Sequence, residues 1–202
     1  MITEAEATRI VEAIRTAETR TTGEIFCVIA HASSSYRLVP VAWAAMLALA
    51  VPLPLIYATR WPVSVIYLAQ LAAFIVTVFV LSLGVLRFRI VPKRTLHHRA
   101  HTEAVRQFLA HGLHLTEQRT GVLIFASVAE RYAEIIADAG INDKVTPAVW
   151  QDAVDILIAS IREGRAGDGF IAAIQKCQIV LAQHFPPGAI NRDELPNKLV
   201  VM

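Results

Sequence analysis

Two pairs of histidines have the spacing at which a helix places both rings on one face. His97 and His101 are four residues apart, and His111 and His114 are three residues apart. Side chains at these spacings can bind one metal ion from a helix. However, no third ligand follows at a fixed spacing and the sequence contains no His-Glu-x-x-His motif. We therefore expect solvated histidines near a basic membrane surface, with no metal and no cofactor.

The two cysteines are the other side chains capable of covalent chemistry. Cys27 lies in an apolar run and Cys177 in a helical pattern near the end of the chain. A small apolar thiol packs well in a core, and a cytosolic location keeps thiols reduced. We expect both to be reduced core residues, with a catalytic or disulfide role as the alternative.

The sequence contains no phosphate-binding loop, nucleophile elbow or dinucleotide fingerprint. Polar side chains do follow two expected strands, and open α/β sheets bind ligands beyond the carboxyl ends of their strands. Such residues could bind an anion or coordinate a cation, although polar residues are ordinary in loops. These candidate ligand-binding residues are Ser33, Ser34, Ser127, Glu130 and Arg131; catalytic residues stay unassigned.

The strands that must position these residues are short, apolar and rich in β-branched side chains. Residues 24–30 and 121–127 each follow a Thr-Gly pair and read as buried strands, and 131–137 reads as a third. We predict that the first two are neighbours in one sheet, with the first strand parallel to its neighbours.

Helices are predicted around the strands. Thr3 and Glu6 form a capping box, and Ile10 and Ile14 lie on the apolar face of the helix that follows. Further helices are expected over 96–115, 147–162 and 169–185, the last with Asp168 as a candidate cap, and the tail from Pro186 is expected to be loosely ordered. Alternating strands and helices predict a small α/β layered sandwich.

Residues 38–86 carry Arg60 as their single formal charge. The charge-free runs 38–58 and 61–86 are each long enough to cross a bilayer core as a helix. Pro52 and Pro54 are expected to kink the first. The alternative is a buried helical pair in a soluble protein, but the rest of the chain is too small to cover two such helices. We predict a transmembrane hairpin.

Basic residues cluster directly after the hairpin. Arg87, Arg89, Lys93, Arg94 and Arg99 are expected to lie at the membrane surface. Because short basic flanks stay on the cytoplasmic side, we expect an inner-membrane protein with two spans and both termini in the cytoplasm. The net charge of +2 is local to this stretch, so nucleic-acid binding is not implied. The expected partners are the lipid bilayer and other integral membrane proteins.

The expected domain organisation is a soluble domain interrupted by the hairpin. Its first part is 1–37, the hairpin is 38–86, its second part is 87–187, and 188–202 is a tail.

Several segments in this order resemble the TPM domain family, which is named for a thylakoid lumen protein, a photosystem II repair protein and a worm receptor modulator. They are the opening helix, Thr22–Ile29, Thr120–Phe125, Glu130–Ile141, Trp150 and Gly167–Phe170. The chain departs from the family in its inserted hairpin and in Gln118-Arg119-Thr120-Gly121, where Asn-Asn-Gly is common.

The resemblance implies an α/β sandwich and a function between assembly or repair of membrane complexes and weak acid phosphatase activity. Acidic clusters linked to calcium or phosphatase chemistry in some members have no clear match here. We therefore expect an interaction module that assists a membrane complex, with a weak membrane-bound phosphatase as the alternative.

Overall fold

The structure is a computed structural model that describes residues 2–34, 36, 38–83, 91–187 and 195–202. The chain forms two compact units. One unit combines Met1–Ser33 with His97–Met202, and the other is Ser34–Leu96. The first unit is therefore assembled from segments on both sides of the apolar stretch.

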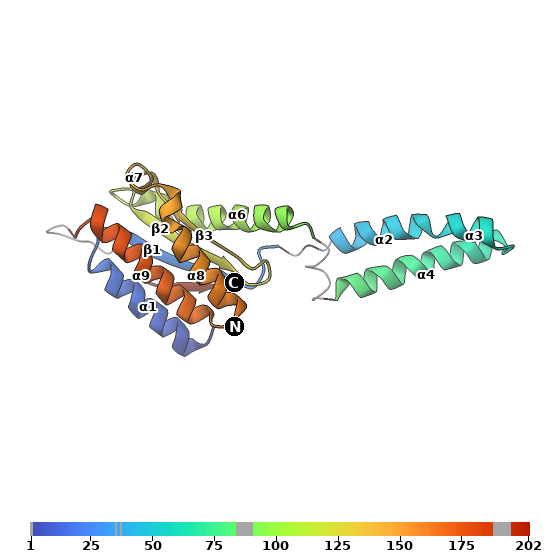
Figure 1. The fold of residues 1–202 in the computed structure, drawn as a ribbon, viewed down its shortest axis with the longest axis horizontal. Coiled ribbons are helices and arrows are strands. Elements are labelled where there is room, and N and C mark those ends of the chain that lie inside the picture. The colour runs from blue at the N-terminus through green and yellow to red at the C-terminus, as the bar shows by residue number, and fades with distance from the viewer. Residues whose placement is uncertain (1, 35, 37, 84–90, 188–194) are drawn as a thin grey trace. The chain divides into compact units, whose positions relative to one another are not determined.

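A four-stranded sheet in the order β3-β2-β1-β4 forms the centre of the first unit (Figure 1). Its strands are β1 (Glu24–Ala30), β2 (Gly121–Ser127), β3 (Tyr132–Ala137) and β4 (Leu199–Val201). β1 pairs in parallel with β2, from Glu24 opposite Gly121 to Ala30 opposite Ser127, and β3 runs antiparallel to β2. The predicted α/β fold is confirmed, with the first two strands adjacent and parallel.

The C-terminal residues join this sheet, so the prediction of a loosely ordered tail is wrong for its last residues. β4 pairs in parallel with β1, Cys27 lying opposite Leu199. Beyond it, the His31 N–H donates to the Met202 carbonyl oxygen at 2.7 Å. A three-residue strand has almost no local signal, and its hydrogen bonds come from a strand that is remote in sequence.

Three helices cover one face of the sheet: α1 (Glu4–Glu18), α8 (Gln151–Arg162) and α9 (Ala166–His184) (Figure 1). The capping box of α1 is present, because Glu6 N–H donates to Thr3 Oγ1 and Thr3 N–H donates to Glu6 Oε2. Ile10 and Ile14 are fully buried against this face. The N-terminal helix therefore closes a core that residues after position 120 largely build.

The opposite face of the sheet is covered by α6 (Lys93–Ala110). Alternate residues of a strand point to opposite faces, so Phe26 packs here against Ala100 and Ala104 of the helix. α6 ends before the predicted residue 115, because Gly112 adopts a left-handed φ of +71° that favours glycine and ends the helix. A short 3-10 turn, Leu113–Leu115, leads on toward β2.

Two short helical segments connect β3 to the last helices. They are α7 (Ala139–Asn142) and the 3-10 segment Pro147–Trp150, which runs into α8. α9 begins at Ala166, earlier than predicted, so Asp168 lies inside its first turn and not at its cap. There its carboxylate pairs with the Arg9 guanidinium at 3.0 Å.

The second unit contains α2 (Leu38–Ala50), α3 (Pro52–Ala58) and α4 (Val63–Ser82). The first apolar helix divides at Val51, directly before Pro52, where a proline is expected to interrupt it. α2 packs on α4 through a side on which Pro40, Ala44 and Ala48 are buried. Two stretches, Leu38–Ala58 and Val63–Ser82, are long and apolar enough to cross a membrane. The predicted end of the second span, 84–86, lies outside the described residues.

Candidate functional site

The carboxyl ends of β1 and β2 bring together three of the five candidate residues. Ser127 ends β2, and its hydroxyl donates a hydrogen bond to Glu130 Oε2. The Ser33 N–H, in the segment leaving β1, donates to Glu130 Oε1 at 2.9 Å. The Glu130 side chain thus links the two chain segments beyond the parallel strand ends.

The other two candidates do not join this group of contacts. Ser34 belongs to the second compact unit. Arg131 is exposed and has a φ of +51°, and its N–H closes a tight turn by donating to the Val128 carbonyl at 3.2 Å. A left-handed arginine costs about 1 to 2 kcal/mol, which the turn from β2 into β3 offsets.

A serine hydroxyl beside a carboxylate is an arrangement that can make a nucleophile. Here Ser127 has no exposed surface and Glu130 is 5% exposed, so both groups are shielded from solvent. Ser33 Oγ is also buried and has no hydrogen-bond partner within the described part of the chain. The arrangement therefore ties β2 to the segment that leaves β1.

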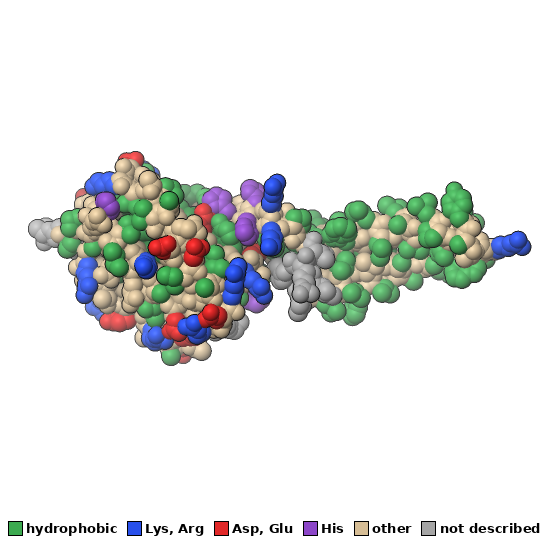
Figure 2. Space-filling model, viewed as in Figure 1, with side chains coloured by type: hydrophobic (Ala, Val, Ile, Leu, Met, Phe, Trp, Pro, Cys, Tyr) green, Lys and Arg blue, Asp and Glu red, His purple; other side chains and the backbone are tan. Residues whose placement is uncertain are grey.

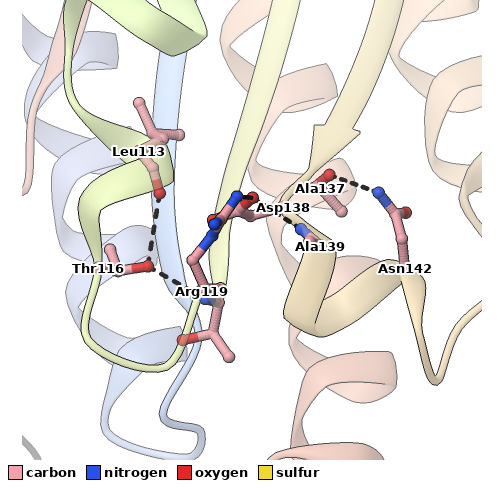
Figure 3. Close-up of polar contacts among 8 residues, drawn as sticks. Leu113, Thr116, Arg119, Ala137, Asp138, Ala139 and Asn142 are labelled. Atoms are coloured by element: carbon pink, nitrogen blue, oxygen red, sulfur yellow. Dashed lines mark hydrogen bonds and ion pairs between the residues drawn. The ribbon is translucent and has the colours of Figure 1, made fainter.

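A second polar arrangement, which the sequence did not reveal, lies at the opposite end of β2 (Figure 3). The Arg119 guanidinium binds the Asp138 carboxylate with two contacts, Nε to Oδ2 at 2.9 Å and Nη2 to Oδ1 at 3.0 Å. Asp138 is 5% exposed and also accepts from the Ala139 N–H at 2.7 Å, which caps α7. The pair joins the loop before β2 to the end of β3.

The opposite charges of Arg119 and Asp138 offset each other. Its contact with Asp138 raises the pKa of the Arg119 guanidinium, and the guanidinium keeps its outer edge in solvent, with 56% of its side chain exposed. Gly140 makes the arrangement possible, because a Cβ there would lie 2.5 Å from the Gln118 carbonyl oxygen. The sequence offered one signal for this arrangement. Asp138 is a residue type that caps helices, and Gly140, two residues later, allows a close approach of another backbone segment.

The histidines of α6 meet β3. His101 Nδ1 lies 2.9 Å from both Glu134 carboxylate oxygens, and the Tyr132 hydroxyl donates to Glu134 Oε2 at 2.9 Å. Burial first, and then the Glu134 charge, raise the pKa of Tyr132 well above its ordinary value. The His97 ring packs on Tyr132 with 5.2 Å between centroids. Two histidines of α6 and two side chains of β3 therefore form one connected polar group.

The other histidine pair has a different environment. The His111 ring lies 4.4 Å from that of Phe26, and burial, followed by the Lys198 charge, lowers the pKa of His111. His114 lies in the 3-10 turn. Over the described ranges, with their gaps at 84–90 and 188–194, no group of three or more His, Cys, Asp or Glu side chains is placed to hold a metal ion.

Both cysteines are fully buried free thiols in the core beneath α9. Burial raises the pKa of Cys27 well above its ordinary value and that of Cys177 to about 12. A thiol in this state is neither a nucleophile nor a metal ligand.

Comparison with known proteins identifies part of this fold. Residues 85–180 match the model of the TPM domain. Among solved structures, the chain is similar to the NMR structure of the BA42 protein from the psychrophilic bacterium Bizionia argentinensis, with a TM-score of 0.63 and 21% identity over 100% of this chain and 96% of that one. None of the curated proteins compared matches the sequence. At this identity the likeness to BA42 concerns the fold alone.

Proposed function

Because residues 85–180 match the model of the TPM domain, we propose that this protein is a membrane-anchored interaction module that assists the assembly, stability or repair of a membrane protein complex. The observation that carries the proposal is the exposure of the apolar helical pair that lies between β1 and β2 in the sequence. The buried carboxylates of the domain add a second argument for an interaction module over an enzyme, because their partners are other side chains and backbone groups of the domain.

The apolar helices leave most of their surface uncovered. In the most apolar part of the two candidate spans, only 17% and 6% of the residues are buried. Leu49 is 70% exposed and Phe79 69%. A core helix of a soluble protein hides such side chains, and each large one left in water forgoes about 1.5 to 3 kcal/mol. A lipid bilayer is the environment that removes this penalty for all of them.

The pairing of β1 with β2 supports a hairpin topology for the two candidate spans. β1 ends before the first candidate span and β2 begins after the second, yet they pair along their whole length in one sheet. The chain therefore leaves and returns on the same side of the bilayer. The basic residues after the second span favour the cytoplasmic side of an inner membrane, with both termini there and Arg60 on the far side. Lys93, Arg94 and Arg99 belong to α6, whereas Arg87 and Arg89 lie outside the described residues.

The environment of the candidate residues favours binding over catalysis. Glu130 accepts from Ser127 and Ser33, and Asp138 is bound by Arg119. These contacts hold loops in place, and a reactant would have to break them to reach either carboxylate. The proposed partners are integral membrane proteins that contact the exposed surface of the domain or the hairpin.

Photo-crosslinking in native membranes tests the proposal. A photoreactive amino acid is placed singly at Leu115, Val149 or Ile179, which are exposed on the domain, and at Leu49 in the hairpin. We expect a discrete crosslinked membrane protein from at least one position on the domain, lost when an unrelated two-span hairpin replaces 38–86.

The competing function is a weak phosphatase. Release of phosphate from a generic phosphomonoester by the full chain in detergent, abolished by Arg119→Lys or Glu130→Gln, together with no discrete crosslink, would replace the interaction module with an enzyme. Ile179→Ala serves as the matched control, because it changes an exposed residue of α9 away from both carboxylates.

A further inference from the structure

The exposed side of α6 has an unusual composition. In its first three turns the exposed side chains are almost all basic or histidine: Lys93, Arg94, His97, His98, Arg99 and His101. The first acidic residue of the helix is Glu103, and its carboxylate is bound by Arg106 and Gln107, each at 2.7 Å. Figure 2 shows Lys, Arg and His side chains gathered over this helix. We call these six residues the α6 basic face.

Contacts with β3 distinguish the histidines of this face. His101 lies against the Glu134 carboxylate, with Nδ1 2.9 Å from Oε2. His97 packs on the Tyr132 ring, whose hydroxyl also binds Glu134. His98 is exposed on the outer side of the helix. Two of the three histidines are therefore held by β3, whereas His98 faces solvent.

We propose that the α6 basic face binds the phosphate groups of anionic lipids in the bilayer that holds the hairpin. The inference rests on the proposed membrane anchoring. Arginine and lysine are the side chains that bind phosphate oxygens best.

Charge distribution selects a lipid surface over a nucleic acid. From Gln107 to Met202 acidic residues outnumber basic ones, whereas the first three turns of α6 contain no acidic residue before Glu103. That helix follows the second candidate span, which ends at Ser82, in the sequence. A local cationic face next to a membrane anchor matches the plane of anionic headgroups, where each basic residue changes the bound-to-free ratio about fivefold.

A fluorescent label on α6 tests this in the full chain reconstituted into nanodiscs. Thr102, exposed on α6, is changed to Cys and labelled, since Cys27 and Cys177 are fully buried. In discs that contain phosphatidylglycerol we expect strong quenching by headgroup-labelled lipid in low salt, and we expect it to be lost in high salt. Equal quenching in discs of phosphatidylcholine alone would overturn the proposal.

Matched variants test the charged residues. Lys93→Gln and Arg94→Gln should each weaken binding about fivefold. His101→Gln should leave the quenching unchanged, because that ring is held by Glu134. If His101→Gln weakened the quenching as much as Lys93→Gln does, the assignment of the binding residues would be wrong.

Two further labels keep the anchoring and the lipid face distinguishable. A label at Leu49→Cys reports on the hairpin: no quenching by lipid-chain quenchers would mean that the anchoring itself fails. Quenching at Leu49 without any at Thr102 would overturn the lipid face alone. A label at Ile179→Cys on α9 should stay unquenched in every disc.

If soluble phosphopeptide changed the Thr102 signal in phosphatidylcholine discs as much as anionic lipid does, the partner would be a phosphoprotein and the proposal would fail.

Discussion

The two faces of the sheet are covered very differently. α1, α8 and α9 cover one face with a large apolar cluster that contains Ile10, Leu157 and both cysteines. The other face is covered by α6, which contributes Ala100, Ala104 and Phe108 to a much smaller cluster. The same helix carries its basic and histidine side chains outward. We infer that the first face supplies most of the stability of the domain, whereas the second face holds a surface available for binding.

The largest effect is expected on the three-helix face. Ile10→Asp places a charge at a fully buried position of α1, so the charge must be buried without a partner or the helix must leave the core. The free energy of unfolding should fall by about 4 kcal/mol. Hydrogen exchange of the β1 amides in the full chain in detergent measures it. Glu12→Asp, at an exposed position of the same helix, is the control. If Ile10→Asp exchanged like the parent, α1 would not belong to the core.

A smaller loss is expected from a buried aromatic residue on the α6 face. Phe26→Ala removes a ring that is 1% exposed, and such truncations cost about 3 to 5 kcal/mol. We expect the lower end, because His111 and Lys198 lie against this ring and can relax into the space. Val201→Ala, at an exposed strand position, is the control for the same exchange measurement. A loss larger than that of Ile10→Asp would reverse the ranking of the two faces.

Close packing of α6 on the sheet gives the next prediction. Ala104 has no exposed surface, so Ala104→Leu must push the helix away from Phe26 and Phe125 or distort it, which costs about 1 to 3 kcal/mol. Thermal unfolding followed by circular dichroism measures the shift, with Thr102→Leu on the exposed side as the control. An unchanged melting temperature would show that α6 is only loosely attached.

The smallest effect is a pH dependence on the α6 face. Burial lowers the pKa of His111, so the folded protein binds this proton more weakly than the unfolded chain does. The stability is complete above the ordinary histidine pKa and decreases as the pH falls through it. His111→Gln should make stability between pH 7 and pH 5 less dependent on pH, by less than about 1 kcal/mol because the ring is partly solvated. Denaturant midpoints at the two pH values test this, and a steeper dependence in the variant would contradict it.

Local patterns were sufficient to predict the main elements. The apolar, β-branched runs of β1 and β2 have few alternatives to a buried strand, and the capping box at Thr3 and Glu6 fixes where α1 starts. The charge-free stretches around Arg60 likewise allow few structures besides apolar helices. In each case the signal lies within one segment, so no knowledge of distant contacts is needed.

The tertiary structure alone decided which side chains meet. Glu130 is an ordinary loop residue until the parallel pairing of β1 with β2 places the Ser33 N–H beside it. Arg119 and Asp138 form a pair only because β3 runs back antiparallel along β2. β4 exists because β1 offers it an unpaired edge. These contacts join residues that are remote in sequence, and their energy depends on a geometry that no single segment contains.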